Sequence, residues 1–528
     1  MATIDETMQD IMIQRIFIKL AIILIPFFVY MITIPGNHTE AEDAFAYTSI
    51  AENPEASWVQ FQHMLYFPTI KGLHKVLVFL GNTGHSYHGL ILFHIIIGVF
   101  CVFLFQLFLC DKLKVTQASS LIGAFLLAFT YGFWRYAVEV EIPVLACLMS
   151  LVLLYFGFCE NYTVSRVLGL GIIGALAILF HGLNALIACT IIPLRMFIKA
   201  GIWYPLAYTA SAALILFTVY GFGASVSSTA STASEIVSPL KFNFSFDPIF
   251  LAKGVIGLGQ AGLSGNFVFG NEWLAKWVES LFISKTLTEE IYTGQSAPKG
   301  LFYASIASII FLCLSFLWLI ISRIHLRFRM PANKDIYYII IWLTIFLTFV
   351  MLFGDNSPEM PIAGWIPIWI VIIFYVIDPL CRNNKILPCV CFAFFFFLHN
   401  LVGGMVWIWS PDGDFYRARS VWLLDNVGPD DLIIAGEKHG FTRYLRYWGK
   451  MNIVNIYGMD EGMFHAVEDK INNWQGNVYV LEEVIDRPKY LCFQDASFCD
   501  RLSEFDGRLR PNLKEVPQSG PSKIYKIE

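Results

Sequence analysis

Long apolar segments separated by short polar turns dominate the chain up to residue 409. About 20 apolar residues in a helix cross the ~30 Å hydrocarbon layer of a bilayer. The pattern therefore predicts about eleven membrane spans. They are 16–34, 88–110, 118–134, 142–159, 166–181, 183–198, 203–223, 301–322, 336–353, 362–380 and 387–408. The Phe180-His181-Gly182 break favours two short helices over one long tilted helix in the middle of this series.

The pattern changes after residue 409. Apolar runs that are typical of strands occupy 431–436, 454–458, 478–483 and 523–528, and helical patterns lie near 439–448 and 460–473. This alternation predicts a small α/β layer. The predicted fold class is thus an α-helical polytopic membrane protein, with a transmembrane domain over 1–409 and an extracytoplasmic α/β accessory domain over 410–528. In the loop 224–300, apolar residues from Trp273 to Leu281 recur at helical spacing, as in an interfacial helix or a loop helix packed on protein.

The basic residues of the short loops indicate the orientation, because cytoplasmic loops are enriched in Lys and Arg. With the N-terminus in the cytoplasm, the short external loops contain Arg135 and no other Lys or Arg. The cytoplasmic loops then contain Lys112, Lys114, Arg166, Arg195, Lys199, Arg323, Arg327, Arg329, Lys334, Arg382 and Lys385. The loops 35–87 and 224–300 and the tail 410–528 face outside. We expect a multi-pass membrane protein with its C-terminus outside.

Composition agrees with this picture and excludes one class of partner. The chain is 56% hydrophobic and 15% charged, with a mean hydropathy of +0.60, whereas soluble domains carry about 25% charged residues. A net charge of −5 leaves no basic surface for binding nucleic acid. Membrane lipids are the expected surroundings of the apolar spans. Cys492 and Cys499 in the tail are either a disulfide of an oxidising compartment or two unrelated thiols. Sequons at Asn37 and Asn243 fall in the external loops.

Two acidic clusters lie at the external face. Glu42 and Asp43 follow the first span closely, and alone they would be read as part of a hydrated loop. Glu139 and Glu141 lie in the tight turn between spans three and four, where Arg135 precedes Glu139 by one helical turn and could pair with it. This turn is aromatic and apolar, so its acids are expected to line a protein cavity. Acids at a membrane edge are costly unless solvated, paired or functional, so two clusters on one face indicate a site.

Further polar groups fall on the same face, and each also has a simpler interpretation. His63, Tyr66 and Lys71 lie in the first external loop, and His181 lies at the break between two helices. A single His on an apolar helix is usually a satisfied core group. Glu359 belongs to the segment GDNSPEMP, which is also typical of a plain turn.

The order of these motifs resembles the GT-C glycosyltransferase superfamily. The resemblance is greatest to bacterial protein O-mannosyltransferases and lipid A aminoarabinose transferases, over about the first 200 residues. It rests on an acidic motif after span one (Glu42, Asp43, Tyr47), a His-x-Leu-Tyr-x-Pro segment (His63, Leu65, Tyr66, Pro68), a Phe-Trp-x-x-Ala-x-Glu-x-Glu turn (Phe133, Trp134, Ala137, Glu139, Glu141) and a His at the external break (His181). The acidic motif reads Glu-Asp where many relatives have Asp-Asp or Asp-Glu, so either Glu42 or Asp43 is the base. Pro143 replaces a Tyr that often follows the second acid, which leaves the role of Glu141 open.

The resemblance implies transfer of a sugar from a polyprenyl-phosphate donor to a glycan, lipid or protein acceptor at the external leaflet, with inversion. Such a displacement needs a general base, for which Asp43 is the first candidate, with Glu141 as its partner and with Glu42 and Glu139 nearby in sequence. The departing phosphate needs positive charge, which Arg135, Lys71 and His63 could supply. Tyr66, His181 and Glu359 are the other expected substrate-binding residues. No cofactor follows from the residues alone. Some members of the superfamily use a divalent metal such as Mg²⁺ or Mn²⁺, which Asp43 and Glu141 could bind, although their spacing does not indicate a metal site.

The competing class is a transporter that uses the external acids as a substrate or ion pathway. Transporters commonly show inverted repeats and polar residues at the bilayer midplane. This sequence has no internal repeat that we detect, and its polar groups gather at one surface. A non-catalytic scaffold is a third class, and it would not need acids among aromatic residues. A polysaccharide polymerase is a fourth class, whose external loops are usually rich in Arg, whereas the loop 224–300 contains only Lys as a basic residue.

Overall fold

The structure, a computed structural model, describes most of the chain. The described residues are 19–39, 41, 43–56, 63–226, 248–281, 287–326, 333–353, 359–436, 440–457, 459–485, 496–517 and 521–528. Their contacts divide the chain into two compact units. The first, here called the membrane unit, comprises Met1–Ile34, Ile50–Gly265 and Ala304–Met405, and the second, the C-terminal unit, comprises Pro35–Ser49, Asn266–Tyr303 and Val406–Glu528. The C-terminal unit therefore includes two segments of the external loops besides the tail.

Apolar helices lie where the hydrophobic pattern predicts spans. Among the described residues, six are long enough to cross a membrane, namely Tyr87–Lys112, Gly182–Ala200, Trp203–Gly223, Lys299–Ile324, Met360–Arg382 and Ile386–Met405. Five shorter apolar helices cover Lys19–Ile32, Gln117–Ala128, Pro143–Gly157, Val164–Phe180 and Ile336–Leu352. Each of the predicted spans overlaps one of these helices, so the protein is an integral membrane protein.

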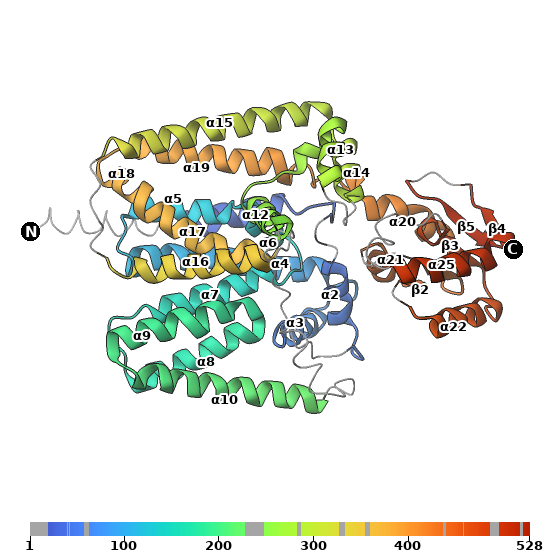
Figure 1. The fold of residues 1–528 in the computed structure, drawn as a ribbon, viewed down its shortest axis with the longest axis horizontal. Coiled ribbons are helices and arrows are strands. Elements are labelled where there is room, and N and C mark those ends of the chain that lie inside the picture. The colour runs from blue at the N-terminus through green and yellow to red at the C-terminus, as the bar shows by residue number, and fades with distance from the viewer. Residues whose placement is uncertain are drawn as a thin grey trace, which may run out of the picture. The chain divides into compact units, whose positions relative to one another are not determined.

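The helices of the membrane unit are drawn in Figure 1. Several contain a π turn, which often marks a functional or packing irregularity. In chain order they are α3 (Tyr66–Phe79), α4 (Tyr87–Leu107) with η1 (Phe108–Lys112), α5 (Gln117–Ala128), α6 (Tyr131–Ala137), α7 (Pro143–Gly157), α8 (Val164–Phe180), η2 (Gly182–Asn184), η3 (Ile187–Ile191), α9 (Ile192–Ala200), α10 (Trp203–Val226), α12 (Pro248–Gly262), α15 (Lys299–Ile324), α16 (Ile336–Phe353), η6 (Met360–Gly364), α17 (Trp365–Ile372), η7 (Ile373–Ile377), α18 (Asp378–Arg382), α19 (Ile386–Asn400) and η8 (Leu401–Met405).

The break at His181 is confirmed. Helix α8 ends at Phe180, and His181 takes an extended conformation (φ −159°, ψ 125°) before the short turn η2. Helices α8 and α10 pack side by side (Figure 1) through small residues of α8. A Cβ added at Gly171 would lie 1.8 Å from Ser211 Oγ, and one added at Gly174 would lie 2.1 Å from Tyr208 Oη. Close approach of this kind is how membrane helices associate without a hydrophobic driving force between them.

Helix α12 was not predicted, because the loop 224–300 was expected to contain only the helix around Trp273. It packs on α6, α16 and η6 of the membrane unit. Glycines permit this contact: a Cβ at Gly254 would lie 2.6 Å from Val350 O, and one at Gly262 would lie 1.9 Å from the Trp365 ring. The segment is apolar with four glycines on a short helix, so periodicity alone did not distinguish it from a flexible loop.

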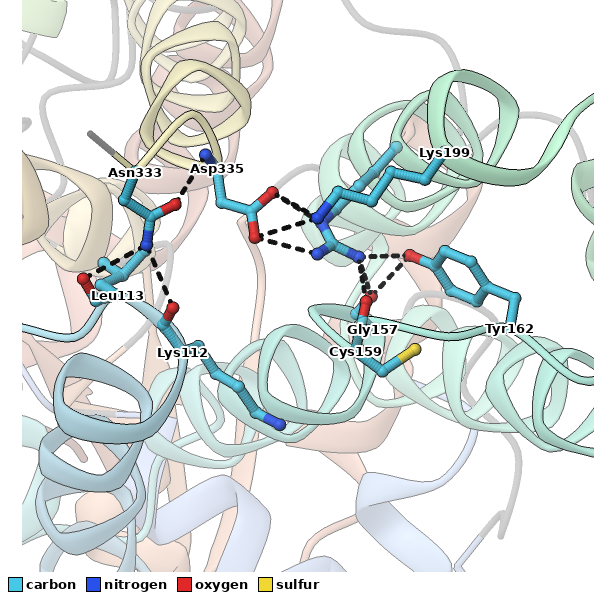
Figure 2. Close-up of polar contacts among 9 residues, drawn as sticks. Lys112, Leu113, Gly157, Cys159, Tyr162, Lys199, Asn333 and Asp335 are labelled. Atoms are coloured by element: carbon cyan, nitrogen blue, oxygen red, sulfur yellow. Dashed lines mark hydrogen bonds and ion pairs between the residues drawn. The ribbon is translucent and has the colours of Figure 1, made fainter. Parts of the chain in front are cut away.

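A buried polar cluster around Arg195 joins three helices at the ends that we predict to face the cytoplasm. Figure 2 shows Asp335 near Lys199, with Tyr162, Gly157 and Cys159 on the other side. The fully buried Arg195 guanidinium donates to Asp335 Oδ2 at 2.9 Å and to the carbonyl oxygens of Gly157 and Cys159 at 3.0 and 2.9 Å. It also lies 4.7 Å from the Phe158 ring centroid. The carboxylate, the two carbonyl oxygens and the aromatic ring together replace the water that the buried guanidinium has lost, as a buried charge requires.

The C-terminal unit contains the predicted α/β layer. Its strands are β1 (Leu432–Ala435), β2 (Asn452–Asn455), β3 (Val478–Leu481), β4 (Leu513–Glu515) and β5 (Ile524–Ile527), in the sheet order β2-β1-β3-β5-β4. Strands β1, β2 and β3 are parallel, and β5 is antiparallel to β3 and β4. Helix α2 (Asp43–Glu52) belongs to this unit as far as Ser49. The other helices of the unit are η5 (Asn266–Gly270), α13 (Glu272–Leu281), α14 (Thr288–Ser296), η9 (Pro411–Gly413), α20 (Phe415–Asn426), α21 (Phe441–Gly449), α22 (Glu461–Asn472), α23 (Glu482–Ile485), α25 (Ala496–Leu509) and η10 (Arg510–Asn512).

The sheet is covered on both faces. Leu432, Ile434, Val478 and Val480 pack with residues of α22 and α25 in one apolar core. On the opposite face Tyr479 contacts Trp422 of α20, with ring centroids 5.7 Å apart. The central parallel strands are buried at every position, as expected for strands covered on both faces.

The four predicted strands are present, with small differences. Strand β2 begins two residues before the predicted run, and the predicted end of the third run, from Glu482, forms helix α23 instead. Strand β4 was missed because LKE has no apolar alternation, and α20 and α25 were missed as well. The helix predicted around Trp273 is confirmed as α13, which buries Ala275 against Phe269 and leaves Trp273 and Trp277 exposed. Cys499 is disulfide-bonded, whereas Cys492 lies outside the described residues.

Candidate active site

The turn after α6 contains a fully buried ion pair. Arg135 Nη1 donates to Glu139 Oε1 at 2.9 Å, and both side chains have 0% exposure. The i,i+4 pairing predicted from the sequence is therefore confirmed. The other carboxylate oxygen, Glu139 Oε2, accepts a hydrogen bond from Tyr87, the first residue of α4. Removing a carboxylate from water is very costly unless its charge is compensated. The contacts with Arg135 and Tyr87 therefore allow Glu139 to be buried.

Glu141 lies among buried groups from α3 and α4. It is 1% exposed. Burial and, secondarily, the charge of Glu141 raise the pKa of Tyr66 well above its usual value, so the phenol stays a hydrogen-bond donor. Tyr66 Oη lies 3.3 Å from His94 Nε2, and His94 Nδ1 lies 2.8 Å from Leu90 O. Because Nδ1 faces a carbonyl, a neutral His94 carries its proton there and Nε2 accepts from Tyr66. We call Arg135, Glu139, Glu141, Tyr66, Tyr87 and His94 the Arg135 cluster.

The two histidines of the sequence motifs come together. The His63 and His181 rings have centroids 5.3 Å apart at 36°, and the Leu65 amide donates to Leu179 O at 3.1 Å beside them. Burial lowers the pKa of His63 to about 4. At neutral pH, His63 would therefore meet a substrate as a neutral imidazole and not as the cation that we expected.

Lys71 caps the end of a helix. Its Nζ donates to the carbonyl oxygens of Asn53 and Ala56 at 2.9 and 2.6 Å, just beyond the last residue of α2. The residue is 2% exposed, and burial lowers its pKa. A cation at a helix C-terminus compensates the unsatisfied carbonyls and the helix dipole. In this arrangement the ammonium stabilises the loop after α2.

Asp43, the first candidate for the base, lies in the C-terminal unit as the first residue of α2. Its Oδ1 pairs with Arg443 of α21, and its Oδ2 accepts from Tyr47 Oη at 3.2 Å. The side chains of Asp43 and Arg443 are 33% and 27% exposed. We call these three residues the Asp43 cluster. Arg443 carries no motif in the sequence, and we did not anticipate its role.

The segment before Asp43 is anchored in the same unit. Backbone amides of Gly36 and Asn37 donate to Trp409 O and Ile408 O at 3.1 and 3.0 Å. The Asn37 side-chain amide donates to Gly413 O at 2.8 Å and is 0% exposed, so this sequon asparagine is not accessible for modification. The His38 amide donates to Asp414 Oδ2, a residue whose other oxygen caps α20.

Aromatic side chains fix α2 against α21. Phe45 is fully buried, and its ring lies 5.1, 5.9 and 6.2 Å from those of Tyr444, Tyr447 and Trp448. Edge-to-face and tilted contacts at these distances stabilise the packing beyond the area that they bury. Because Asp43 precedes Phe45 and Arg443 precedes Tyr444, this packing holds the two charged groups together.

Some predicted site residues are not brought into either cluster. Glu42 lies outside the described residues, as does Asn243. Glu359 is half-buried and precedes η6. Asp43 belongs to the C-terminal unit and Glu141 to the membrane unit. Among the described ranges, no three His, Cys, Asp or Glu side chains gather closely enough to hold a metal ion.

Sequence reasoning missed Tyr87, His94 and Arg443. The position of His94 within a predicted span could have indicated its role, since an ionisable residue inside a membrane span is costly and usually has a partner. Tyr87 had no such signal, because a Tyr at the start of a span is typical of the membrane interface. Arg443 becomes visible only when α21 folds against α2.

Comparisons with known proteins support the fold. No protein-family model matches the sequence, and no curated protein matches it. In structure, the chain is similar to ArnT from Cupriavidus metallidurans bound to undecaprenyl phosphate, with a TM-score of 0.51, 12% identity and coverage of 97% of this chain and 98% of that chain. The apo state of the same protein gives a TM-score of 0.51 at 11% identity with the same coverage. The chain is also similar to an oligosaccharyltransferase from Archaeoglobus fulgidus, with 11% identity and coverage of 96% of this chain and 72% of that chain. The TM-score of 0.49 is too low for this likeness to support a conclusion.

ArnT is an aminoarabinose transferase of the GT-C superfamily, the one that the sequence motifs resemble. The match spans the apolar helices and the small C-terminal sheet alike, because it covers nearly the whole of both chains. This protein therefore has the fold of the GT-C glycosyltransferases.

Proposed function

We propose that this protein is a GT-C glycosyltransferase that moves a sugar from a polyprenyl-phosphate donor to a glycan, lipid or protein acceptor at the external face of the membrane. The observation that carries the proposal is the GT-C fold over 97% of the chain, shared with an ArnT structure that contains undecaprenyl phosphate. Such a reaction needs carboxylates, and the buried acids of the Arg135 cluster and Asp43 at the start of α2 are the candidates.

In the proposed reaction, Asp43 acts as general base. It accepts the proton of the acceptor hydroxyl while that oxygen attacks the anomeric carbon, and the donor's phosphate leaves with the bonding electron pair. Attack opposite the leaving group inverts the anomeric centre. Phosphate is a good leaving group, so alignment and charge stabilisation supply most of the remaining effect.

The remaining carboxylates and polar groups have supporting roles in the proposal. Glu141 is the second carboxylate of the site, and Glu42 is the alternative base. Glu139 acts through its ion pair with Arg135. His63, Tyr66, Lys71, His181 and Glu359 contact the donor or the acceptor. A divalent cation such as Mg²⁺ or Mn²⁺ is a further part of the proposal, since carboxylates are its usual ligands.

Two observations support an external site and an external C-terminus in a bacterial inner membrane. The basic residues Lys112, Lys114, Arg195 and Lys199 gather at the loops assigned to the cytoplasm. Cys499 in the C-terminal unit is disulfide-bonded, which is typical of proteins in oxidising compartments.

The test is direct transfer by the purified full-length protein in nanodiscs. Radiolabelled undecaprenyl-phosphate sugars, supplied singly, should be converted to free undecaprenyl phosphate when a membrane extract is given as acceptor. Release of the lipid phosphate without a labelled product would limit the activity to hydrolysis. Absence of both, together with ion or substrate flux in proteoliposomes, would favour the transporter alternative. Addition of EDTA to an active preparation, with Mg²⁺ or Mn²⁺ add-back, tests the metal.

A further inference from the structure

The cations expected to bind the donor phosphate are already engaged within the membrane unit. Arg135 is fully buried and its charge is matched by Glu139. Lys71 is 2% exposed and donates to two carbonyl oxygens. His63 is neutral near pH 7 because burial lowers its pKa to about 4. A phosphodiester that approached these groups would have to displace partners that are buried with them, which is costly.

Arg443 differs from these residues in exposure and in partner. Its side chain is 27% exposed, and its partner, the Asp43 carboxylate, is 33% exposed, so a ligand can reach both. An ion pair with this exposure contributes little stability, and an incoming anion can replace the carboxylate at small cost.

The guanidinium is nevertheless held in place. Helix α21 begins after Gly440 (φ +65°), and its first residue, Phe441, lies under the Arg419 guanidinium at 4.2 Å from the ring centroid. Arg419 itself pairs with Glu483 at 2.7 Å in a buried site. The ring of Phe45 also packs against Tyr444 of α21. Arg443 thus lies on a rigid helix next to the proposed base.

We propose that Arg443 binds the phosphate of the polyprenyl-phosphate donor and exchanges its ion pair with Asp43 for one with that phosphate. The inference rests on the proposed function and extends it by assigning recognition of the donor's phosphate to a residue of the C-terminal unit. A guanidinium forms the same two-pronged hydrogen bonds with a carboxylate or with a phosphate. No covalent bond changes in this exchange. It leaves the Asp43 carboxylate without its ion pair, with the hydrogen bond from Tyr47 still in place, and the carboxylate can then accept the proton of the acceptor hydroxyl.

The test measures binding of undecaprenyl phosphate to the full-length protein in nanodiscs by native mass spectrometry. Arg443→Ala should weaken binding about tenfold or more, since charge-assisted hydrogen bonds are among the strongest polar contacts, and Arg443→Lys should retain part of the affinity. Arg508→Ala is the matched control. It removes a comparable surface ion pair, with Glu468 at 2.8 Å, in the same domain, and should leave binding unchanged.

A second arm separates exchange from a merely structural role. Asp43→Asn removes the carboxylate that competes for Arg443, so this variant should bind undecaprenyl phosphate more tightly than the wild type. The gain should vanish in the double variant Asp43→Asn/Arg443→Ala. If Asp43→Asn instead binds equally or more weakly, the exchange is wrong. If Arg443→Ala binds as the wild type does, the assignment of Arg443 is wrong while the proposed function stands. If the wild type binds no undecaprenyl phosphate and transfers no sugar, the proposed function itself is wrong.

Discussion

Several of the buried charged side chains that the structure describes have partners of opposite charge close by. Arg135 pairs with Glu139, Arg195 with Asp335, and Arg419 with Glu483. Only the first of these pairs lies within one turn of a single chain segment. In a low-dielectric interior, an ion is tolerated when its partner and its hydrogen bonds replace the water that it loses. Asp43 and Arg443 are different, because they meet at a partly exposed place where a substrate can compete.

At this scale the first prediction concerns the base. Asp43→Asn keeps the size of the side chain and removes its basicity, so turnover of an undecaprenyl-phosphate sugar should fall by ~10²–10⁴-fold. Donor binding should persist. Glu42→Gln is the control and should stay active. Loss of activity in Glu42→Gln with normal transfer by Asp43→Asn would move the base by one residue, and full activity in both variants would remove this loop from the catalytic mechanism.

The second residue-scale prediction concerns the buried ion pair. Arg135→Met leaves Glu139 without its charged partner, and breaking such a pair typically costs about 3–5 kcal/mol. The midpoint of thermal unfolding in detergent should fall clearly. The double variant Arg135→Met/Glu139→Gln removes both charges and should recover part of the loss. If the double variant is less stable than Arg135→Met, the pair is not the main reason for the destabilisation.

At the scale of elements, glycine determines which helices touch. Gly171 and Gly174 lie where α8 meets α10, while Gly169 on the same helix has no atom within 4 Å of an added Cβ. Glycines permit the docking of α12 in the same way: Gly254 faces Val350 of α16, Gly262 faces Trp365 of α17, and Gly132 of α6 faces Ala261 of α12. These contacts depend on the absence of a side chain, so hydropathy does not reveal them.

The third prediction compares two glycines of α8. Gly171→Ala should destabilise the protein, since the new Cβ would overlap Ser211 Oγ and overpacking typically costs about 1–3 kcal/mol. Gly169→Ala faces open space and should be neutral or stabilising by up to about 1 kcal/mol through helix propensity. The two thermal midpoints, measured side by side in one detergent, decide the matter. Equal midpoints would show that α8 and α10 do not pack as described.

At the scale of the whole molecule, the chain divides into a helical membrane unit and a C-terminal unit that also includes 35–49 and 266–303. The candidate base lies in the second unit, at the start of α2. The segment that carries the proposed base is therefore part of the same compact unit as the tail 410–528. Removal of the tail from residue 410 onward should abolish activity and should also disturb the segment around Asn37, because Gly413 and Asp414 accept hydrogen bonds from the Asn37 side chain and the His38 amide.

The fourth prediction is the topology. A reporter active only outside the cytoplasm, fused after residue 410, should give a signal, and the same reporter fused after Met330 should not. The reason is the enrichment of Lys and Arg in the loops assigned to the cytoplasm. The opposite result would place the acids on the wrong face for a donor in the external leaflet and would refute the orientation.

The sequence by itself determined the apolar helices of the predicted spans, the break at His181, the Arg135–Glu139 pair and four of the strands. These features follow from local rules: the thickness of the bilayer sets the span length, and helical geometry places residues i and i+4 together. Only the tertiary structure decided that α12 docks on α6, that Tyr66 meets His94, and that Arg443 lies against Asp43. Such contacts join segments far apart in the chain. They depend on how whole elements pack, and no local periodicity encodes that packing.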